Sequence, residues 1–386
     1  MRSVLFTHIR PHDLLVVDGR FADPAVTPEN TVIVDGRGAL ALPSPVDAHI
    51  HPDKTTWGQP WLSRAHAETL VDLIEGDVRA RADMTASVAE RAGALMDAAI
   101  ARGTRAWRAH VDVAPVYGLA NVHGVREAAA ARAGLIDVQI VAFPQLGLLT
   151  RPGTAELMER ALAEGADVIG GLDPLGIDGD LHGHLDVLFG LAERTGAPVD
   201  IHLHDRGEPG LTQVKEIARR AAGHAVTISH AFCLGEDTAA ARTLDELIAR
   251  SGIALTTCAL GGDPVLPVGP LTGAGVLLAA GSDGVRDPWT PFGDGDMIAR
   301  AHLLAYRTDA RTDEELAACY AVVAHGGAAL LGLERVEFQA GDPADFVLVD
   351  AGSLAEAVVD RPIPQFVVRG GVVIAQDGQL LERSPR

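Results

Sequence analysis

The feature that most restricts the fold of this chain is a regular alternation of short apolar segments with longer amphipathic ones. Eight apolar segments have the length and composition of β-strands, at 46–51, 105–113, 137–143, 167–172, 198–204, 225–230, 253–257 and 276–283. Helix-like segments separate most of them, at 87–101, 154–164, 183–195, 211–222 and 237–250. Because helical crossovers join consecutive parallel strands, these units predict an α/β fold, a (β/α)8 barrel of the TIM type.

Local signals support individual elements of this pattern. Ser87 and Glu90 have the spacing of a capping box at the start of the helix at 87–101, and Gly103 follows its end. The segment 258–275 is instead rich in glycine and proline, so we expect a loop there and one irregular unit in the barrel.

The two ends of the chain have strand patterns without helices between them. These are segments 13–18 and 31–35 near the start and 345–350 and 365–375 near the end, where Gly370-Gly371 is typical of a hairpin turn. We therefore expect a small β-sandwich domain built from residues 1–44 and 333–386, which flank a barrel domain at 45–332.

Composition restricts the partners of the protein. The 386 residues include 47% hydrophobic and 22% charged residues and carry a formal net charge of −20, which argues against binding to nucleic acid or to an anionic membrane. The start of the sequence lacks the apolar region of a signal peptide, and no apolar run has spanning length. The three cysteines form no CxxC pair. We expect a cytoplasmic protein that acts on a small molecule, and we allow for a homo-oligomer.

Metal-type residues lie where the predicted strands end. His49 and His51 end the first barrel strand, His202 lies on the fifth, His230 ends the sixth and Asp283 ends the eighth. A TIM barrel gathers the carboxyl ends of its strands at one mouth, so residues distant in sequence meet there. Three imidazoles and a carboxylate can hold a divalent metal that keeps a position for water. The pattern therefore predicts a metal-dependent hydrolase.

The segment DIHLHD at 200–205 holds two more polar side chains near this mouth. His204 shares a strand face with His202 and is either a pocket residue or a polar loop residue, while Asp205 lies on the opposite face or in the next loop. In the segment GSDGVRDPW, Asp283 is a better chemical candidate than Asp287, because Asp287 precedes a proline and is typical of a turn.

Four other polar residues are expected to lie further from the chemistry. His110 and Asp112 share one face of the second strand, behind the expected ligands. His182 and His184 fall at the start of a helix, and we expect them at the surface.

In several of these segments the chain resembles the amidohydrolase superfamily, and within it the bacterial cytosine deaminase branch. The matching segments are LPSPVDAHIHPDKTTWGQPW, RAHVDV, VAFPQLG, DIHLHD, ISHAFCLG and SDGVRDPWTPFG. They cover most of the predicted barrel in order, and the C-terminal strands are similar to the small sandwich of the superfamily.

The resemblance implies a mononuclear metal centre. One divalent ion per chain, zinc or iron(II), would be bound by His49, His51, His202 and Asp283. The fourth strand, VIGGLDP, has no lysine, so the bridging carbamylated lysine of binuclear relatives is not expected.

The expected catalytic residues are Asp283, Asp205 and His230. Asp283 would accept the proton of the metal-activated water, Asp205 would protonate the substrate ring, and His230 would stabilise the developing negative oxygen. The resemblance also places Gln145 at an amide-like edge of the substrate. His204 and Trp289 are further candidate substrate contacts.

Two positions differ from the pattern of the branch. Asp205 stands where the branch has a glutamate, and Gly284 stands where it has a second aspartate. A shorter acid and open space beside Gly284 favour a ring that is larger or more substituted than cytosine. We predict an aminohydrolase that deaminates a cytosine-like nitrogen heterocycle. Two alternatives remain: hydrolysis of a cyclic amide or N-alkylamino heterocycle, and a catalytically silent metal-binding relative.

Overall fold

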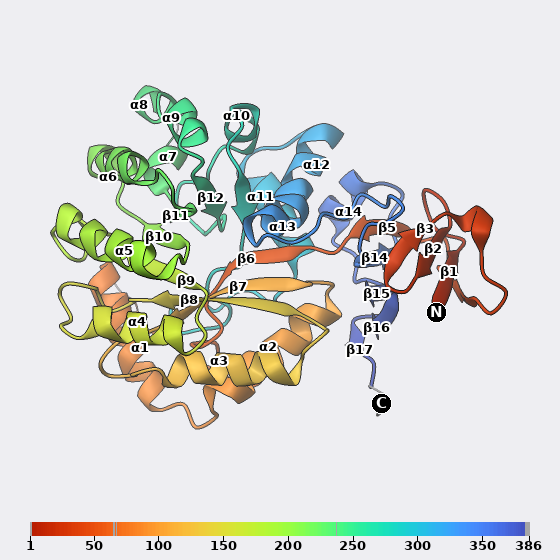
Figure 1. Cartoon of the computed structure of the whole chain (residues 1–386), viewed down its shortest axis with the longest axis horizontal. Helices are drawn as coiled ribbons and strands as arrows, with labels where there is room; N and C mark the ends of the chain where they lie inside the picture. Colours follow the sequence, from red (N-terminus) through yellow and green to blue (C-terminus); the bar gives the residue numbers. More distant parts are fainter. Residues whose placement is uncertain (1, 65, 67, 237, 383–386) are drawn as a thin grey trace.

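The computed structural model describes all residues except 1, 65, 67, 237 and 383–386 (Figure 1). Its centre is a parallel sheet of eight strands in sequence order: β6 (Val46–Ile50), β7 (Ala106–Asp112), β8 (Asp137–Phe143), β9 (Val168–Leu172), β10 (Val199–Leu203), β11 (Val226–His230), β12 (Ala254–Thr257) and β13 (Leu278–Ala280). A parallel bridge between Ile50 and Asp283 joins the last strand region to the first, so the sheet is a nearly closed barrel. The predicted barrel is confirmed.

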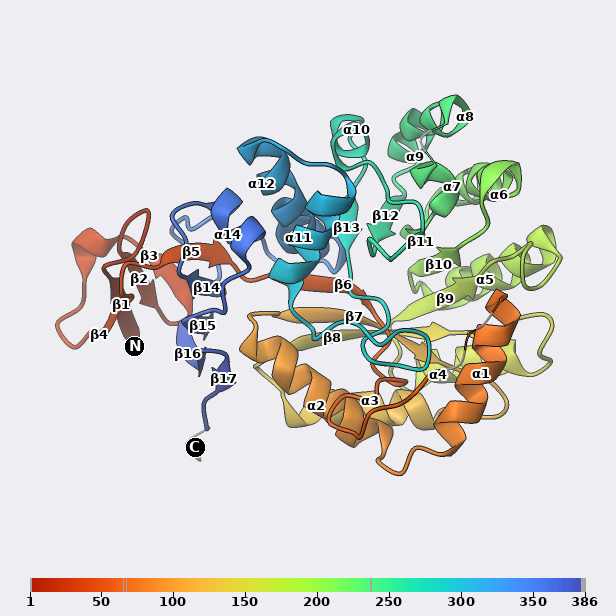
Figure 2. The same cartoon turned by 180° about the vertical axis from the view of Figure 1, so that it is seen from behind.

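Helices surround this sheet, most of them on its outer side (Figures 1 and 2), while the first packs at the carboxyl ends of the strands, where Ile74 clusters with Phe143 and Leu172. They are α1 (Leu70–Ala82), α2 (Val88–Ala101), α3 (Ala120–Ala131), α4 (Thr154–Ala163), α5 (Leu181–Thr195), α6 (Gly207–Arg220), α7 (Phe232–Gly235), α8 (Ala239–Arg242), α9 (Asp245–Arg250), α10 (Val268–Gly273), α11 (Met297–Arg307), α12 (Asp313–Ala321), η2 (Val322–Gly326) and α13 (Gly327–Leu330).

Most local predictions agree with these helices, and two need correction. The Ser87–Glu90 capping box is present at the start of α2. The helix predicted at 237–250 is divided into α8 and α9, and residue 237 lies outside the described residues. The loop predicted at 258–275 contains the short helix α10. This helix begins directly after Pro267, and the proline ring holds its φ at −73°, close to the helical value.

Strand β7 explains why polar residues occur in fully buried strands. Trp107 and Ala109 belong to the apolar core. Side chains of the opposite parity point to the barrel interior. There Arg108 Nη1 donates a hydrogen bond to Asp200 Oδ2 at 2.9 Å, and the ring of His110 stacks on that of His49 with centroids 3.9 Å apart. The interior of the barrel is therefore largely polar and leads to the mouth.

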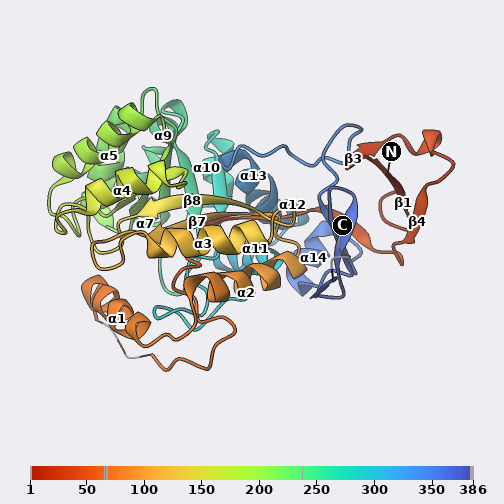
Figure 3. The ribbon, with the colours of Figure 1, turned by 60° about the horizontal axis from the view of Figure 1, so that its bottom comes forward.

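The two chain ends form two small sheets beside the barrel (Figure 3). One contains β1 (Ser3–Thr7), β2 (Leu14–Val17), β3 (Arg20–Ala22) and β4 (Val32–Asp35), with η1 (Pro24–Val26) before β4. The other contains β5 (Leu40–Pro43), β14 (Phe346–Val349), β15 (Phe366–Arg369), β16 (Val372–Gln376) and β17 (Gln379–Leu380), with α14 (Leu354–Asp360) between β14 and β15.

A shared core joins the two ends of the chain. Strand β5 pairs antiparallel with β14, and the ring of Phe346 packs against Phe6 and Phe21 with centroids 5.1 and 5.5 Å apart. Both ends therefore contribute to the small β region, while the exact domain bounds at 44/45 and 332/333 stay a prediction. Within the described part of the chain, no helix has both the length and the apolar character needed to cross a membrane.

Candidate active site

Four predicted metal ligands converge at the carboxyl end of the barrel. His51 Nε2 lies 3.3 Å from His49 Nε2 and 3.2 Å from His202 Nε2. Asp283 Oδ1 lies 3.4 Å from His49 Nε2 and 3.2 Å from His51 Nε2. Ligands about 2.0–2.1 Å from a tetrahedral ion are separated by about 3.3 Å. The donor atoms thus stand at the corners of a polyhedron that fits one divalent ion.

Backbone contacts between the first and last strand regions set this geometry. The N–H of Asp283 donates to the carbonyl of His49 at 2.8 Å, and the N–H of His51 donates to the carbonyl of Asp283 at 3.3 Å. The two segments approach so closely that a Cβ on Gly281 would lie 2.5 Å from the Cβ of His49. Only glycine fits at this position.

A hydrogen-bond chain behind His49 fixes which ring nitrogen is free. Ser229 Oγ donates to Asp200 Oδ1 at 2.7 Å, so this hydroxyl accepts from His49 Nδ1 at 3.0 Å. His49 is therefore protonated on Nδ1 and presents the lone pair of Nε2 to the cluster.

The charge states of the cluster also suit a cation. Burial lowers the pKa of His51 to about 4, and the Lys54 ammonium acts in the same direction. Burial likewise lowers the pKa of His202 well below its ordinary value. Burial acts to raise the pKa of Asp283, but its contacts with His49 and His51 hold that pKa well below its usual range. The short contacts among these nitrogen and oxygen atoms outnumber the protons available to form hydrogen bonds. Neutral imidazoles and one carboxylate arranged in this way are a typical donor set for a metal ion.

His230 lies beside this cluster, as predicted from its place at the end of a strand. Its ring centroid is 4.8 Å from that of His49 and 5.0 Å from that of His202. The side chain is buried, and neither of its ring nitrogens has a hydrogen-bond partner in the described part of the chain. Both nitrogens are therefore available to a ligand.

The structure separates His204 from Asp205. His204 lines the cavity above the cluster, and its Nδ1 lies 2.6 Å from Asp173 Oδ2. Burial acts to lower the pKa of His204, but the Asp173 carboxylate raises it above its ordinary value. The sequence analysis missed Asp173, although its position directly after β9 is a signal that could have identified it.

Asp205 does not join the predicted catalytic group. Its Oδ2 accepts hydrogen bonds from the N–H of Gly176 at 2.9 Å and from Gln213 Nε2 at 2.8 Å. These contacts hold the carboxylate between the loop after β9 and helix α6, and Asp205 is not among the residues that line the cavity.

A lysine that the sequence did not single out forms the opposite wall of the cavity. Lys54 Nζ donates to Gln145 Oε1 at 2.5 Å and lies 5.5 Å from the ring centroid of Trp289. Lys54, Gln145 and Trp289 all line the cavity of 310 Å³ that also contains His51, His204 and Asp283. The predicted substrate contacts His204, Gln145 and Trp289 are thus brought together around one space.

Buried carboxylates hold Lys54 in this position. Asp112 Oδ1 lies 3.3 Å from Lys54 Nζ, and Asp112 Oδ2 accepts from Arg81 Nη1 at 2.6 Å. Asp53 Oδ2 accepts from Arg81 Nη2 at 3.0 Å. Burial acts to lower the pKa of Lys54, but the carboxylates of Asp112, Asp77 and Asp53 raise it above its ordinary value, so the ammonium stays ionised at the cavity wall.

The space expected beside Gly284 is occupied. A Cβ on Gly284 would lie 2.1 Å from Asp287 Oδ2, so the Asp287 side chain fills the room that the glycine leaves. Asp287 is a turn residue, as predicted, since its Oδ1 accepts from the N–H groups of Trp289 and Thr290 at 2.9 and 2.8 Å. It also lines the cavity, which the sequence analysis did not foresee.

The prediction for His184 is wrong, while His182 is exposed as expected. His184 is fully buried on the inner face of α5, and its Nδ1 lies 2.6 Å from Asp178 Oδ2. The position along the helix decided this, because residues three or four apart share a face, and Leu181, Leu185 and Leu188 face the core.

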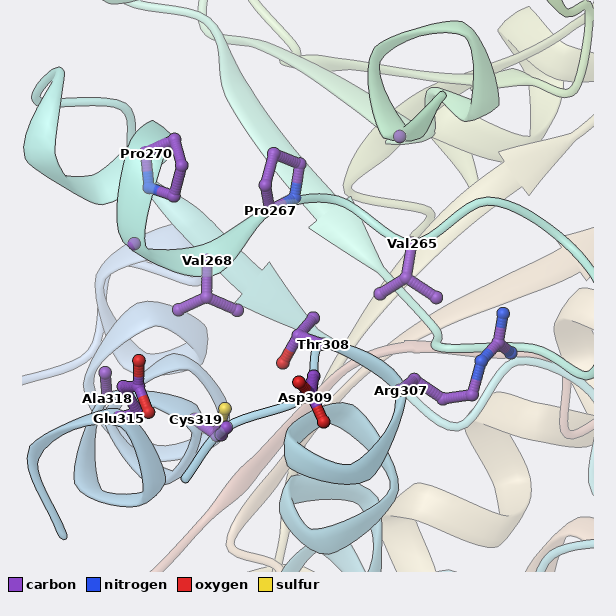
Figure 4. A pocket seen from close by; sticks show the side chains of 13 residues that line it. Val265, Pro267, Val268, Pro270, Arg307, Thr308, Asp309, Glu315, Ala318 and Cys319 are labelled. Carbon is purple, nitrogen blue, oxygen red and sulfur yellow. The ribbon is translucent and has the colours of Figure 1, made fainter. Parts of the chain in front are cut away.

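A second cavity of 490 Å³ lies away from the barrel mouth, between α10, α11 and α12 (Figure 4). The residues around it include Val268, Asp309, Glu315 and Cys319. Arg307 at its edge donates to backbone carbonyls of Leu260 and Asp263. It has no histidine among its lining residues, so the chemistry belongs to the smaller cavity at the mouth.

The barrel, its metal-type cluster and the order of the matching segments define a metal-dependent hydrolase of the amidohydrolase family. The chain belongs to this family, whose model matches residues 73–374. It is an enzyme that acts on C–N bonds other than peptide bonds.

Individual relatives are similar over nearly the whole chain. N-isopropylammelide isopropyl amidohydrolase of Pseudomonas sp. (strain ADP) is 31% identical over 95% of this chain and 94% of that protein. The crystal structure of N-isopropylammelide isopropylaminohydrolase from Burkholderia multivorans has a TM-score of 0.94 and 42% identity, over 99% of this chain and 100% of that one. The crystal structure of 5-methylcytosine deaminase from Klebsiella pneumoniae, with 5-fluorocytosine bound, has a TM-score of 0.80 and 27% identity. The match covers 100% of this chain and 99% of that one.

Proposed function

We propose that this chain hydrolyses the bond between an N-alkylamino substituent and an oxo-substituted nitrogen heterocycle, such as a triazine, and releases the alkylamine. This is the second of the activities considered from the sequence. Water supplies the oxygen that becomes a ring oxo group, and the departing nitrogen gains one proton. The observation that carries the proposal is the full-length similarity to two N-isopropylammelide hydrolases, at 42% identity for one, against 27% for the deaminase.

The orientation of Gln145 supports an oxo-substituted ring. Because its Oε1 accepts from Lys54, its Nε2 is the part of the amide left for the substrate. Two donors, the amide N–H and the ammonium, therefore face the cavity together. Carbonyl oxygens of a dioxo ring match such donors. Cytosine has an N–H group beside a carbonyl group, so its edge would require Gln145 to accept one hydrogen bond and donate another, while Oε1 already accepts from Lys54.

The proposed metal site is the cluster of His49, His51, His202 and Asp283, with one zinc or iron(II) per chain. Such an ion, when bound, lowers the pKa of a water molecule toward neutrality. The carboxylate of Asp283 would accept a proton from the attacking water. His230, whose two ring nitrogens have no hydrogen-bond partner in the described part of the chain, donates to the oxygen that gains negative charge.

We assign delivery of a proton to the departing nitrogen to His204 rather than to Asp205. His204 lines the cavity and Asp173 orients its ring, which leaves Nε2 toward the substrate. Asp205 is held elsewhere by Gly176 and Gln213. The variant Asp205→Asn should keep turnover within a few-fold, because asparagine still accepts a hydrogen bond. His204→Asn should lose at least about 10²-fold, the usual effect of removing an acid or base. A larger loss of turnover in Asp205→Asn than in His204→Asn would instead assign the proton delivery to Asp205.

The substrate class is tested with purified protein of measured metal content. Release of isopropylamine from N-isopropylammelide is compared with release of ammonia from ammelide, cytosine and 5-methylcytosine. We expect the alkylamino substrate to be preferred and cytosine to be poor. A kcat/KM for cytosine on the order of 10⁵ M⁻¹s⁻¹, without isopropylamine release, would favour the deaminase. No turnover of any compound by metal-replete protein would favour the silent relative.

A further inference from the structure

Asp287 is a buried carboxylate with only one of its two oxygens in use. The residue is 1% exposed. Oδ1 accepts from the backbone of Trp289 and Thr290, which forms the turn after the last barrel strand. Oδ2 makes no hydrogen bond with any described residue, and it lies in the space where Gly284 has no side chain.

The position of this free oxygen is at the substrate cavity. Asp287, Gly284, Gln145 and Lys54 line the same space as His51 and Asp283. Burial raises the pKa of Asp287 to about 7, which is the expected effect of desolvating a carboxylate that lacks a full set of donors. A carboxylate oxygen that lies at a cavity and has no partner in the protein is open to a donor from a ligand. In the turn itself an asparagine would serve as well, so the turn does not account for the second oxygen.

We propose that Asp287 is a specificity-determining residue whose Oδ2 accepts a hydrogen bond from an N–H group of the substrate. The inference rests on the proposed function only in taking the substrate to be a nitrogen heterocycle with N–H groups. Gln145 and Lys54 supply donors to the cavity, and Asp287 supplies an acceptor. The complementary ligand is a ring edge in which an N–H group neighbours carbonyl groups, as in a cyclic imide.

Gly284 leaves the space that Asp287 Oδ2 needs in order to reach the cavity. A methyl group at position 284 would meet Asp287 Oδ2 at 2.1 Å, and the carboxylate is the flexible end of a side chain, so it would be pushed aside. Gly284 does not have a positive φ angle, so its backbone tolerates alanine. Gly284→Ala therefore displaces Oδ2 without removing the carboxylate.

The test uses Asp287→Asn and Gly284→Ala with one control. Asparagine keeps an oxygen for the two turn hydrogen bonds and replaces Oδ2 by a donor. The control is Asp294→Asn, because Asp294 Oδ1 accepts from the N–H of Asp296 in a comparable turn and Asp294 does not line the cavity. Metal content and thermal midpoint are measured for every variant.

Binding is measured by calorimetry with 1,3,5-triazinane-2,4,6-trione, the ring product of the proposed reaction, and with its tri-N-methyl derivative, which has no N–H group. Wild-type protein should prefer the N–H ring. Both variants should lose about 10–100-fold in affinity for it, the usual weight of a hydrogen bond to a charged group, and should lose most of the preference. For N-isopropylammelide the loss should appear in KM more than in kcat. Asp294→Asn should match wild type.

The outcomes separate this inference from the proposed function. If no isopropylamine is released but Asp287→Asn still weakens trione binding, the function is wrong and the role of Asp287 stands. If Asp287→Asn keeps affinity and kcat/KM within about twofold of wild type, or if wild type does not bind the trione at all, the inference is overturned. A third outcome would also overturn the inference: Asp287→Asn loses affinity for the trione and has a lowered thermal midpoint, while Gly284→Ala keeps its affinity. In that case Asp287 would only stabilise the turn.

Discussion

The backbone N–H of Asp283 donates to the carbonyl of His49 at 2.8 Å, and this bond joins the residue after the last barrel strand to the first strand. Through it the carboxylate of Asp283 is placed against the imidazoles of His49 and His51. The contacts that close the barrel therefore also bring the residues of the metal-type cluster together.

A first prediction concerns metal content. We expect one divalent ion per chain, because the other possible donor group among the described residues, His49, His110 and Asp200, shares His49 with the group at the mouth. Removing the ion with a chelator should lower the thermal midpoint, since an ion at 100–1,000 times its Kd stabilises the native state by about 3–4 kcal/mol. Elemental analysis of wild type and His49→Ala checks this, with the exposed His182→Ala as control. Two ions per chain, both lost in His49→Ala, would rule out the mononuclear site.

A second prediction concerns Gly281. Its Cβ would lie 2.5 Å from the Cβ of His49 and 2.4 Å from the His49 carbonyl oxygen, so Gly281→Ala forces the closing strands apart. We expect loss of bound metal and a destabilisation of about 2–4 kcal/mol, as for other overpacked buried sites. Gly273→Ala is the matched control, because a Cβ there meets nothing within 4 Å. Equal metal content and equal urea midpoints for the two variants would refute the argument.

A third prediction concerns the hydrogen-bond chain behind His49. Ser229→Ala removes the acceptor of His49 Nδ1 and the donor to Asp200. Loss of such a partner typically costs about 10–100-fold in metal affinity or activity. Thr256→Val on the neighbouring strand is the control, because the buried hydroxyl of Thr256 has no hydrogen-bond partner among the described residues. Metal affinity is measured by competition with a chromogenic chelator. Similar affinities for both variants would show that the serine does not orient the ligand.

A fourth prediction concerns pH and Asp178. Burial acts to raise the pKa of Asp178, but the contact with His184 and the backbone donors of Leu149 and Thr150 lower it to about 2. Because the folded pKa is below the unfolded value of about 3.9, the stabilisation is complete above about pH 5 and is lost as the pH falls toward 2.

The matching variant is Asp178→Asn, studied by urea unfolding at several pH values. At pH 7 it should be less stable than wild type by about 1–3 kcal/mol, the usual effect of weakening buried charged hydrogen bonds. The difference should close between about pH 4 and pH 2. Asp180→Asn should be nearly neutral, because asparagine caps a helix as well as aspartate. A difference that persists at the lowest pH would show that charge is not the cause.

The sequence by itself determined the barrel and the metal-type residues that gather at its mouth, while the choice of four of them as ligands stays a prediction. Eight apolar segments bounded by helix signals were sufficient for the fold, because parallel strands buried on both faces have few other arrangements. His49 and His51 were placed together by strand parity, and His202 and Asp283 by their positions at strand ends. Periodicity along a strand determines side-chain direction, and this information is local.

Tertiary structure alone decided which groups line the cavity at the barrel mouth. Asp205 and His204 are adjacent in sequence, yet Gly176 and Gln213 hold Asp205 away from the cavity while Asp173 orients His204 in it. Lys54 faces Gln145 and Asp287 fills the space beside Gly284 through contacts between distant loops. Beyond the end of a strand the backbone no longer alternates regularly. The direction of each side chain then depends on whichever hydrogen-bond partners the rest of the fold brings near.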